Sequence, residues 1–406
     1  MGRAVRGMLT VLTTPLPDPR VLLAETFGPG EAATVGAPGR VNLIGEHIDY
    51  HGLAVLPVAI RRKVRVAFRA REDGRIRAVS GGGYGIRDFE WTAELSPVAG
   101  GDWENYLRAA ARAVGRKWGE GRGVDAAIVS DLPAAAGLSS SSALLAAFTL
   151  SLLRANGEQP SFEELMEVLP EGEHFVGTRG GGMDHAASLA SRAGYASLIE
   201  FDPLAVRHVR VPAEWAFLAA HSLTVAEKSG AARQQYNACR AAGATALARL
   251  GFASYREAMK GRTLDGLEEL AARGLTTDDE RAGFLHVVSE AWRVGAAVAA
   301  MEQGDGAAFG SLLLASHASL RDRLHVSSAP LNRLVEAAMD SGAWGARLTG
   351  AGFGGCVVVF CRRTDLTAVR RGLIQRYYAG LPEFDEGAHL IHAEPGPGAL
   401  HFDEGS

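Results

Sequence analysis

Apolar residues along the chain follow a period of two in some segments and a helical period in others. Alternating apolar and basic positions within residues 54–69, which include KVRVAFR, predict a strand with one face in water. A short apolar run at 124–129 and the segments YASLIEF and AVRHVRV near 195–211 predict further strands. Ser161 followed by Glu164 forms a capping box, which predicts the start of the helix SFEELMEVL.

The pattern changes near residue 227 to longer helical segments, which one glycine-rich strand–loop–strand, ARLTGAGFGGCVVVF, interrupts. The run Gly36 to Asn42, rich in glycine and proline, is expected to be a loop. Strands and helices in irregular order indicate an α+β fold. Because 406 residues exceed what one core usually holds, we expect two domains, 1–200 and 201–406.

Composition and charge exclude several classes of partner. A hydrophobic content of 47% is ordinary for a globular protein, and a net charge of −4 gives no electrostatic case for nucleic acid or an anionic membrane. No apolar stretch approaches the ~20 residues of a membrane span. The three cysteines, Cys239, Cys356 and Cys361, are odd in number and lack metal-ligand spacing, so reducing conditions are expected. We expect a cytoplasmic monomer, although nothing in the sequence fixes the oligomeric state.

The stretch LPAAAGLSSSSALLAA, residues 132–147, places four serines at the start of an Ala/Leu-rich helix. Free backbone N–H groups and the helix dipole make such a helix start an anion site suited to phosphate. The extra hydroxyls can bind phosphate oxygens or Mg²⁺, but the chain has no G-x-x-x-x-G-K-[ST] motif and therefore no Walker site. One capping serine with small neighbours for close packing is the alternative.

The stretch GRVNLIGEHIDYHG, residues 39–52, gathers carboxylate, imidazole, amide and guanidinium groups within a dozen positions. This density suits a polyhydroxylated ligand, because each sugar hydroxyl needs donor and acceptor partners. A metal site, which lacks the H-E-x-x-H arrangement here, and a plain solvated loop are the alternatives.

Two further glycine-rich stretches carry candidate chemistry. In TRGGGMDHAASL, Asp184 follows three glycines at an expected helix start, where it can accept a proton from a hydroxyl nucleophile or act as an ordinary N-cap. In LTGAGFGG, the glycines and Thr349 either line a ligand or form a tight turn between two strands.

The order of these stretches resembles that of the GHMP kinases, and specifically the galactokinase family. GRVNLIGEHIDYHG is similar to the family's N-terminal signature, P-x-x-x-G-L-S-S-S to its ATP loop and RLTGAGFGG to its third motif; WENY and SLRD match as well. The likeness runs from about Gly36 to the C-terminus. It implies a two-lobed fold, with a mixed sheet in the N-terminal lobe and helices on an antiparallel sheet in the C-terminal lobe.

The resemblance also implies residue roles in a kinase that uses ATP and Mg²⁺. Asp184 would be the catalytic base, or the charge that orients the C1 hydroxyl of a galactose-type sugar, and Arg40 would hold it ionised and stabilise the transferring phosphoryl group. Ser141 and Glu173 would bind Mg²⁺. The implied sugar site comprises Arg40, Glu46, His47, Asp49, Gly181, Asp184 and Tyr236. The implied ATP site comprises Trp103, near adenine, and Gly137, Leu138, Ser139, Ser140 and Ser141.

Several positions depart from the usual galactokinase pattern. Ile48 and His51 replace the threonine and asparagine of EHTDYN, and glycines 180–182 replace C-G-I. EHID and GGGMD resemble the N-acetylgalactosamine kinase branch, in which smaller residues would make room for a 2-acetamido group. Ser142 stands where alanine is usual and His185 where glutamine is usual, and neither has an assigned role.

Two classes of function therefore remain at this point. The first is an enzyme that phosphorylates the anomeric hydroxyl of galactose, or of N-acetylgalactosamine or another sugar. The second is a sensor that binds galactose and ATP without turnover. The complete GLSSSSA run and the presence of both Arg40 and Asp184 favour the enzyme.

Overall fold

The N-terminal half is built on a five-stranded mixed sheet, in the order β1-β2-β5-β3-β4. The computed structural model describes residues 17–133, 136–177, 180–224 and 231–402, without the side chains of 231–233. The strands are β1 (Ala33–Ile44), β2 (Leu56–Ala70), β3 (Arg75–Ser80), β4 (Ile86–Glu90) and β5 (Val124–Ser130). β3 and β5 are parallel and the other neighbours antiparallel, which confirms the expected mixed sheet.

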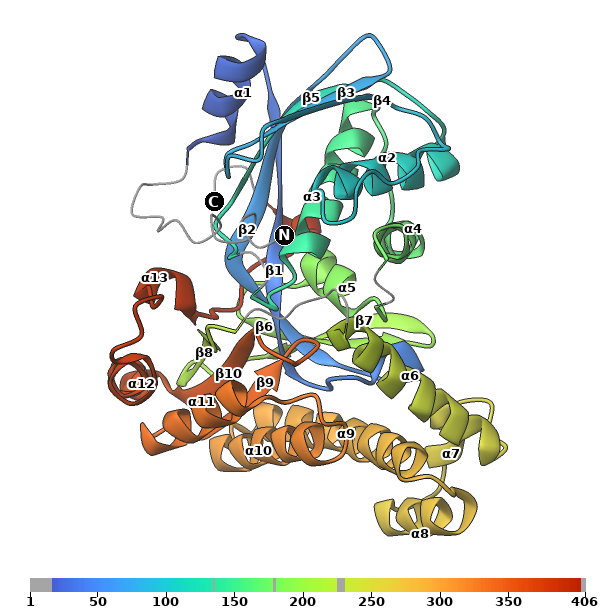
Figure 1. Ribbon diagram of the computed structural model, residues 1–406, viewed down its shortest axis with the longest axis vertical. Coiled ribbons are helices and arrows are strands. Elements are labelled where there is room, and N and C mark those ends of the chain that lie inside the picture. The colour runs from blue at the N-terminus through green and yellow to red at the C-terminus, as the bar shows by residue number, and fades with distance from the viewer. Residues whose placement is uncertain (1–16, 134–135, 178–179, 225–230, 403–406) are drawn as a thin grey trace.

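Helices cover both faces of this sheet (Figure 1). The inner face, which is the face opposite α1, is covered by α2 (Glu104–Trp118), α3 (Ser140–Ala155), α4 (Phe162–Phe175) and α5 (Met183–Ala190). On the outer face, α1 (Pro19–Phe27) places Leu23 against Ala67, Val79 and Ala127. The capping box expected at Ser161 is present at the start of α4, where Ser161 and Glu164 bond each other's backbone N–H.

The prediction of a loop at Gly36 to Asn42 is wrong, because these residues lie inside the twelve-residue strand β1. β1 is an edge strand of the sheet, and its register with β2 shifts between Pro38 and Arg40. A proline is tolerated at such an irregularity on an edge strand, since no ladder hydrogen bond from its nitrogen is needed. The glycine–proline signal therefore marks a bulge instead of a loop, and this bulge immediately precedes Arg40.

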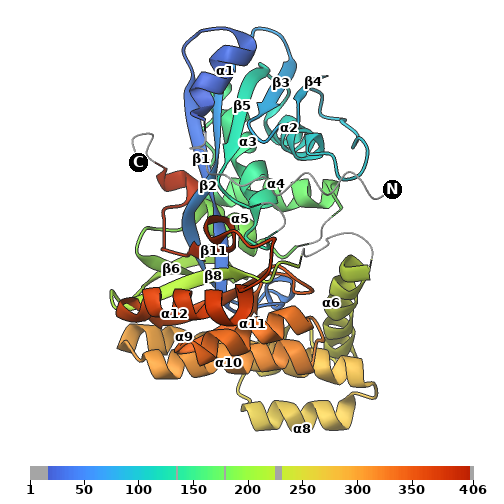
Figure 2. The same ribbon diagram turned by 60° about the vertical axis from the view of Figure 1, so that its left-hand side comes forward.

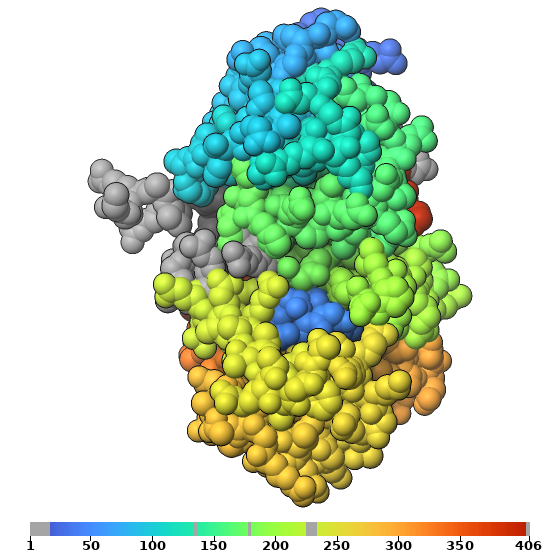
Figure 3. All heavy atoms as spheres, turned by 90° about the vertical axis from the view of Figure 1, so that its right-hand side faces the viewer, coloured from blue at the N-terminus to red at the C-terminus, as the bar shows by residue number. Residues whose placement is uncertain are grey.

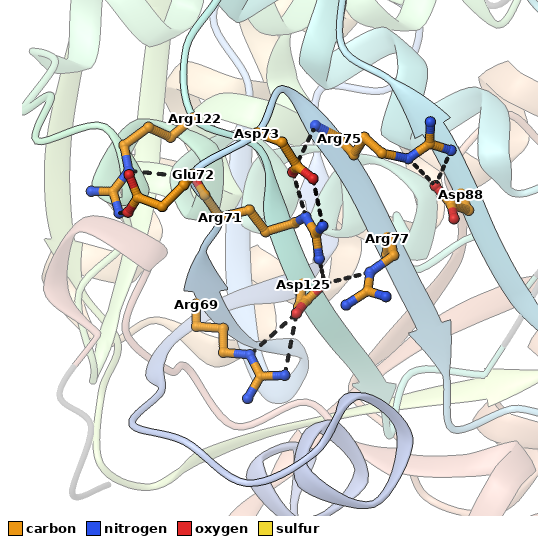
Figure 4. Close-up of polar contacts among 9 residues, drawn as sticks. All are labelled: Arg69, Arg71, Glu72, Asp73, Arg75, Arg77, Asp88, Arg122 and Asp125. Atoms are coloured by element: carbon orange, nitrogen blue, oxygen red, sulfur yellow. Dashed lines mark hydrogen bonds and ion pairs between the residues drawn. The ribbon is translucent and has the colours of Figure 1, made fainter.

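On the outer face of the sheet, away from the motifs, one aspartate forms ion pairs with three arginines (Figure 4). Arg69 and Arg71 on either side of the end of β2, and Arg77 on β3, all reach Asp125 on β5, with N···O distances between 2.7 and 3.2 Å. Arg69 also donates to the carbonyl of Gly28, which follows α1. Burial raises the pKa of Asp125, but hydrogen bonds from Arg77 and Arg71 outweigh it and lower this pKa. The cluster joins three strands and α1.

The C-terminal half contains the antiparallel sheet β11-β8-β10-β9, as expected. Its strands are β8 (Trp215–His221), β9 (Gly345–Thr349), β10 (Cys356–Arg362) and β11 (Leu390–His392), and a separate hairpin pairs β6 (Tyr195–Phe201) with β7 (Leu204–Arg210). Figures 1 and 2 show the long helices layered beneath the four-stranded sheet. The helices are α6 (Ala231–Arg249), α7 (Tyr255–Met259), α8 (Leu264–Gly274), α9 (Asp278–Gln303), α10 (Gly306–Asp322), α11 (Ala329–Asp340), α12 (Leu366–Leu373) and α13 (Glu386–His389).

The chain crosses between the halves near its C-terminal end. After β11, the N–H groups of Gly396 and Gly398 donate to the carbonyls of Ala59 and Ser191, both at 2.8 Å. The domain boundary expected at residue 200 stays a prediction. In the described part of the chain, no helix is long and apolar enough to cross a membrane.

Candidate active site

The motifs of the sequence meet between the two halves, where β1 ends, α3 and α5 begin and β9 turns into β10. The turn after β1 reaches the surface here: in Figure 3 the segment near residue 50 is a blue patch framed by green N-terminal and yellow C-terminal segments. Residues 134–135 and 178–179, which belong to two of the motifs, lie outside the described residues.

Arg40 and Asp184 form an ion pair at the centre of this region. Arg40 Nε and Nη2 lie 2.7 and 2.6 Å from Asp184 Oδ1, and Arg40 Nη1 donates to the carbonyl of Gly137 at 2.8 Å. Burial lowers the pKa of Arg40, but Asp184 and then Glu46 outweigh it, so this pKa is raised. One buried cation therefore joins β1, α5 and the loop before α3.

Asp184 is not the N-cap of α5, because Gly182 occupies that position with φ 100°. Asp184 lies in the first turn, where the helix dipole favours a carboxylate. Its second oxygen, Oδ2, accepts a hydrogen bond from Ser139 Oγ at 2.6 Å. The carboxylate is thus fixed on both oxygens by groups from two other elements, while its side chain keeps 21% of its surface exposed.

The serine run forms the N-terminus of α3 as expected, but the contacts of its individual serines differ from those expected. Ser139 is the N-cap residue in the left-handed region, φ 58°, and within the described chain its hydroxyl caps no backbone N–H group. The alternative interpretation of the run, in which a serine side chain caps the helix, is therefore wrong for Ser139, because its hydroxyl bonds Asp184 instead. Ser140 and Ser141 occupy the first turn, where backbone N–H groups suit a phosphate. Leu138 is buried, so only its backbone can meet a ligand.

The glycine-rich turn between β9 and β10 packs against the serine loop. A β-carbon on Gly350 would lie 3.2 Å from the carbonyl oxygen of Gly137, and one on Gly355 would lie 3.2 Å from that of Ala136. Both glycines also have positive φ. Thr349 is buried, and its hydroxyl bonds the backbone of Asn42 on β1, so it joins two strands and does not line a ligand site.

Glu46 is held on three sides by buried groups from the C-terminal half. Its Oε2 pairs with Arg347 Nη2 at 2.7 Å, and both side chains are almost fully buried. Its carbonyl contacts His286 Nε2 at 3.0 Å. Glu290 on α9 accepts the N–H groups of Gly45, at 2.9 Å, and Glu46, at 3.3 Å. Burial raises the pKa of Glu290, but Arg293 and other cations outweigh this and lower it to about 2, so it is ionised at neutral pH.

The other residues expected in the sugar site lie close to one another. His47 Nδ1 is 2.9 Å from the Tyr50 hydroxyl, and the rings of His47 and Tyr236 are 5.2 Å apart. Asp49 lies so near Gly181 that a β-carbon there would come within 2.4 Å of Asp49 Oδ2. Burial, with Asp184 and Glu46 nearby, raises the pKa of Asp49 to about 7. The structure thus brings together three segments: the turn that contains Glu46, the glycines that precede α5, and helix α6.

The expected magnesium ligands lie on α3 and α4. Ser141 is in the first turn of α3, and Glu173 is buried near the end of α4. A hydroxyl and a carboxylate are oxygen donors of the type that Mg²⁺ prefers, and phosphate oxygens and water usually complete its shell. The donor set therefore fits this ion, and the ligand assignment stays a prediction.

Trp103, expected near adenine, directly precedes α2 and is half-buried. The Arg87 guanidinium lies 5.4 Å from its ring centroid, and among the described residues its indole N–H has no hydrogen-bond partner. Its place beside the nucleotide stays a prediction.

Sequence reasoning missed the residues that support the site from behind. Arg347 precedes the glycines of RLTGAGFGG and is fully buried, while Glu290 and His286 lie on α9 in a segment read only as helical. Charged residues one turn apart on an otherwise apolar helix, as in HVVSEAWR, were the available signal.

Comparison with known proteins gives consistent matches along the chain. Three family models match: the galactokinase galactose-binding signature at residues 23–70, the GHMP kinases N terminal domain at 105–192 and the GHMP kinases C terminal at 297–380. The galactokinase of Roseiflexus sp. (strain RS-1) is 36% identical over 87% of this chain and 90% of that protein. The galactokinase of Homo sapiens is 34% identical over 91% of this chain and 93% of that protein.

Solved structures agree with these matches. A Lactococcus lactis galactokinase complexed with galactose has a TM-score of 0.82 and 28% identity, and the match covers 93% of this chain and 97% of that one. An L. major mevalonate kinase in complex with R-mevalonate has a TM-score of 0.60 and 18% identity, over 90% of this chain and 97% of that one, and shows the fold alone.

Proposed function

The chain belongs to the galactokinase family of the GHMP kinases, and from this premise we propose that it transfers the γ-phosphate of ATP to the anomeric C1 hydroxyl of galactose. It is an ATP-dependent sugar kinase that uses Mg²⁺. The product is galactose 1-phosphate, and ADP is released. The observation that supports this reaction most directly is the Arg40–Asp184 pair, held against the serine loop by Ser139.

The arrangement of charges suits phosphoryl transfer, which depends on positioning and electrostatics. As the C1 oxygen bonds the γ-phosphorus and the bond to the bridging oxygen of ADP breaks, the hydroxyl proton is lost. We propose that Asp184 accepts this proton or orients the hydroxyl, and that Arg40 stabilises the charge on the transferring group. Bound Mg²⁺ neutralises phosphate charge when present.

The sugar is held, in this proposal, by the turn after β1 and the segments that face it. Glu46, His47 and Asp49 bind hydroxyls, with Tyr236 and the backbone of Gly181 completing the site. Gly137 to Ser141 surround the phosphates, with Ser141 and Glu173 as the Mg²⁺ ligands and Trp103 near adenine. These roles rest on the match of the motifs and on the proximity described above.

Galactose is favoured over N-acetylgalactosamine, because the curated relatives reported above are galactokinases. Two departures that resemble the acetamido branch also have explanations in the fold. Ile48 is fully buried in the core, so its side chain is not available to a sugar. Gly182 adopts φ 100° as the N-cap of α5, a conformation that favours glycine whatever the sugar.

The sensor is not favoured, because the relatives are enzymes and both charges of the proposed reaction are in contact. We propose a monomer in the cytoplasm, where the reaction has access to cellular ATP.

The test is ATP consumption by purified protein with Mg²⁺ and a panel of galactose, N-acetylgalactosamine, glucose and arabinose. Phosphorus NMR of the product reads the phosphorylated position. Turnover on galactose with an anomeric phosphate is expected. Preference for N-acetylgalactosamine would overturn the choice of sugar, and binding of galactose without turnover on any sugar would favour the sensor.

A further inference from the structure

Two residues without an assigned role, Ser142 and His185, contact the same carboxylate oxygen. Ser142 Oγ donates a hydrogen bond to Glu173 Oε1 at 2.5 Å. His185 Nε2 lies 3.5 Å from that oxygen. The three side chains come from α3, α5 and α4, so one buried contact joins the helix of the serine loop, the helix of Asp184 and the helix of Glu173.

The imidazole of His185 is fully buried and, among the described residues, neither of its ring nitrogens has a hydrogen-bond partner. Leaving a buried polar group unpaired costs about 1–3 kcal/mol, so such groups are rare in folded proteins. Glu173 Oε1 is a carboxylate acceptor that lies 3.5 Å from Nε2 of this ring. A shift of the carboxylate by about half an ångström would bring Nε2 within hydrogen-bond range.

The second oxygen of Glu173 lies beside a different segment. A β-carbon on Gly180 would lie 3.0 Å from Glu173 Oε2, which places this oxygen beside the glycines that lead to Asp184. The two oxygens are therefore distinct: Oε1 meets Ser142 and His185, and Oε2 meets the segment next to the reaction site.

We infer that Ser142 and His185 are positioning residues, which hold Glu173 Oε1 and thereby present Oε2 to the Mg²⁺ of the nucleotide complex. The inference rests on the proposed function, in which Glu173 binds this ion. Carboxylates that bind metals are themselves hydrogen-bonded, and loss of such a partner typically costs 10–100-fold in metal affinity. In this arrangement the His185 imidazole supplies a second N–H donor beside Oε1, in addition to the Ser142 hydroxyl.

The same geometry explains why the two departures occur together. Ser142 stands where the family usually has alanine and His185 where it usually has glutamine. Both changes alter the groups around one oxygen, Glu173 Oε1, and both side chains are fully buried. They act together on Glu173.

The experiment measures metal affinity directly, with Mn²⁺ as the probe. Free Mn²⁺ is counted by electron paramagnetic resonance in the presence of ADP, for the wild type and for Ser142→Ala, His185→Leu and His185→Gln. The leucine removes both ring nitrogens at similar volume, and the glutamine amide restores a donor. Ser188→Ala is the matched control, since this buried hydroxyl on α5 bonds the Pro38 carbonyl and not Glu173.

We expect His185→Leu and Ser142→Ala to weaken Mn²⁺ binding about 10-fold or more, and His185→Gln to stay within about 3-fold of the wild type. In the double variant Ser142→Ala/His185→Leu the two losses should not add, because both donors serve one oxygen. Ser188→Ala should lower Tm without changing Mn²⁺ affinity.

Unchanged Mn²⁺ affinity in both His185→Leu and Ser142→Ala would overturn the inference. If either variant fails to fold, the other decides. Galactose binding by calorimetry and wild-type turnover test the proposed function separately. Wild-type turnover with unaffected variants removes only this inference, whereas wild-type protein that neither binds Mn²⁺ with ADP nor phosphorylates a sugar removes both.

Discussion

Ser139 Oγ donates a hydrogen bond to Asp184 Oδ2 at 2.6 Å, so the first serine of the run contacts the proposed catalytic carboxylate. The residue adopts φ 58°, and within the described chain its hydroxyl bonds no backbone N–H group of α3. These N–H groups are thereby left for the phosphates. The position of the serine loop and the position of Asp184 depend on each other through this bond.

Removing the Ser139 hydroxyl should slow the reaction. A hydrogen bond to a charged group contributes about 1.5–3 kcal/mol, so Ser139→Ala should lower kcat roughly 10-fold or more, with a smaller change in KM for galactose. Ser139→Gly is the companion variant, because glycine also relieves the left-handed backbone. Equal losses in both would assign the effect to the hydroxyl. Full activity of the glycine variant would assign it to the backbone.

Asp184→Asn should abolish turnover and leave ATP binding largely intact. The amide keeps the size of the side chain, but it cannot accept a proton and no longer offsets the charge of Arg40. Turnover is measured by ADP release, and nucleotide affinity by calorimetry. Asp125→Asn is the control, since this buried carboxylate also pairs with arginines but serves the outer face of the sheet. It should lose stability and keep kcat. An active Asp184→Asn enzyme would remove the proposed base.

Ser141→Ala should raise the Mg²⁺ concentration needed for half-maximal rate. The variant removes one proposed oxygen ligand, while Ser140→Ala in the same turn of α3 removes a neighbouring hydroxyl as a control. Initial rates are measured against Mg²⁺ at constant ATP. If Ser140→Ala shifts the titration and Ser141→Ala does not, the metal ligand is Ser140.

Much of the fold could be predicted from the sequence, because its periods and caps are local signals. The capping box at Ser161 and the paired strands near 195–211 formed as expected. The segment Gly36 to Asn42 did not, since composition alone does not distinguish a bulged edge strand from a loop. Only the pairing with β2 settles it.

The sequence predicted the site residues that lie within motifs. It did not predict the residues from distant segments that hold those site residues in place. Arg40 and Asp184 are 144 residues apart and were joined only by resemblance; the structure places them in contact. Arg347, Glu290 and His286 hold Glu46 from segments about 240 to 300 residues away. The sequence signals polar residues on an apolar helix at His286 and Glu290, but it does not show which residue they contact. These three residues are identified by their tertiary contacts and not by a local sequence pattern.

Glu290→Gln should raise KM for galactose more than KM for ATP. Glu290 accepts the N–H groups of Gly45 and Glu46 and pairs with Arg293, so its charge fixes the turn that carries the proposed sugar ligands. We expect roughly a 10-fold rise in KM for galactose, about one lost charged hydrogen bond. Glu280→Gln on the same helix is the control, because Glu280 pairs with Arg249 and not with the turn. Equal changes in both KM values would indicate only a general loss of structure.

The affinity for galactose should rise with pH near neutrality. Burial, followed by Asp184 and Glu46, raises the pKa of Asp49 to about 7, so the group is protonated below this pH and ionised above it. Only the ionised form accepts hydroxyl hydrogen bonds on both oxygens, and KM for galactose should therefore fall between pH 6 and 8, by at most about 10-fold per pH unit. Asp49→Asn should bind more weakly and remove this slope.

The raised pKa of Asp49 also determines whether the free energy of unfolding should rise or fall with pH. A folded-state pKa of about 7, above the ordinary value of 3.8, means that the folded chain holds this proton more tightly than the unfolded chain. The contribution of Asp49 to the free energy of unfolding is therefore fully present below about pH 4 and is lost as pH rises through 7. Urea unfolding of the sugar-free protein should show Asp49→Asn gaining on the wild type across this window. Parallel curves for the two proteins would mean that Asp49 is ionised at neutral pH and that the slope in KM has another source.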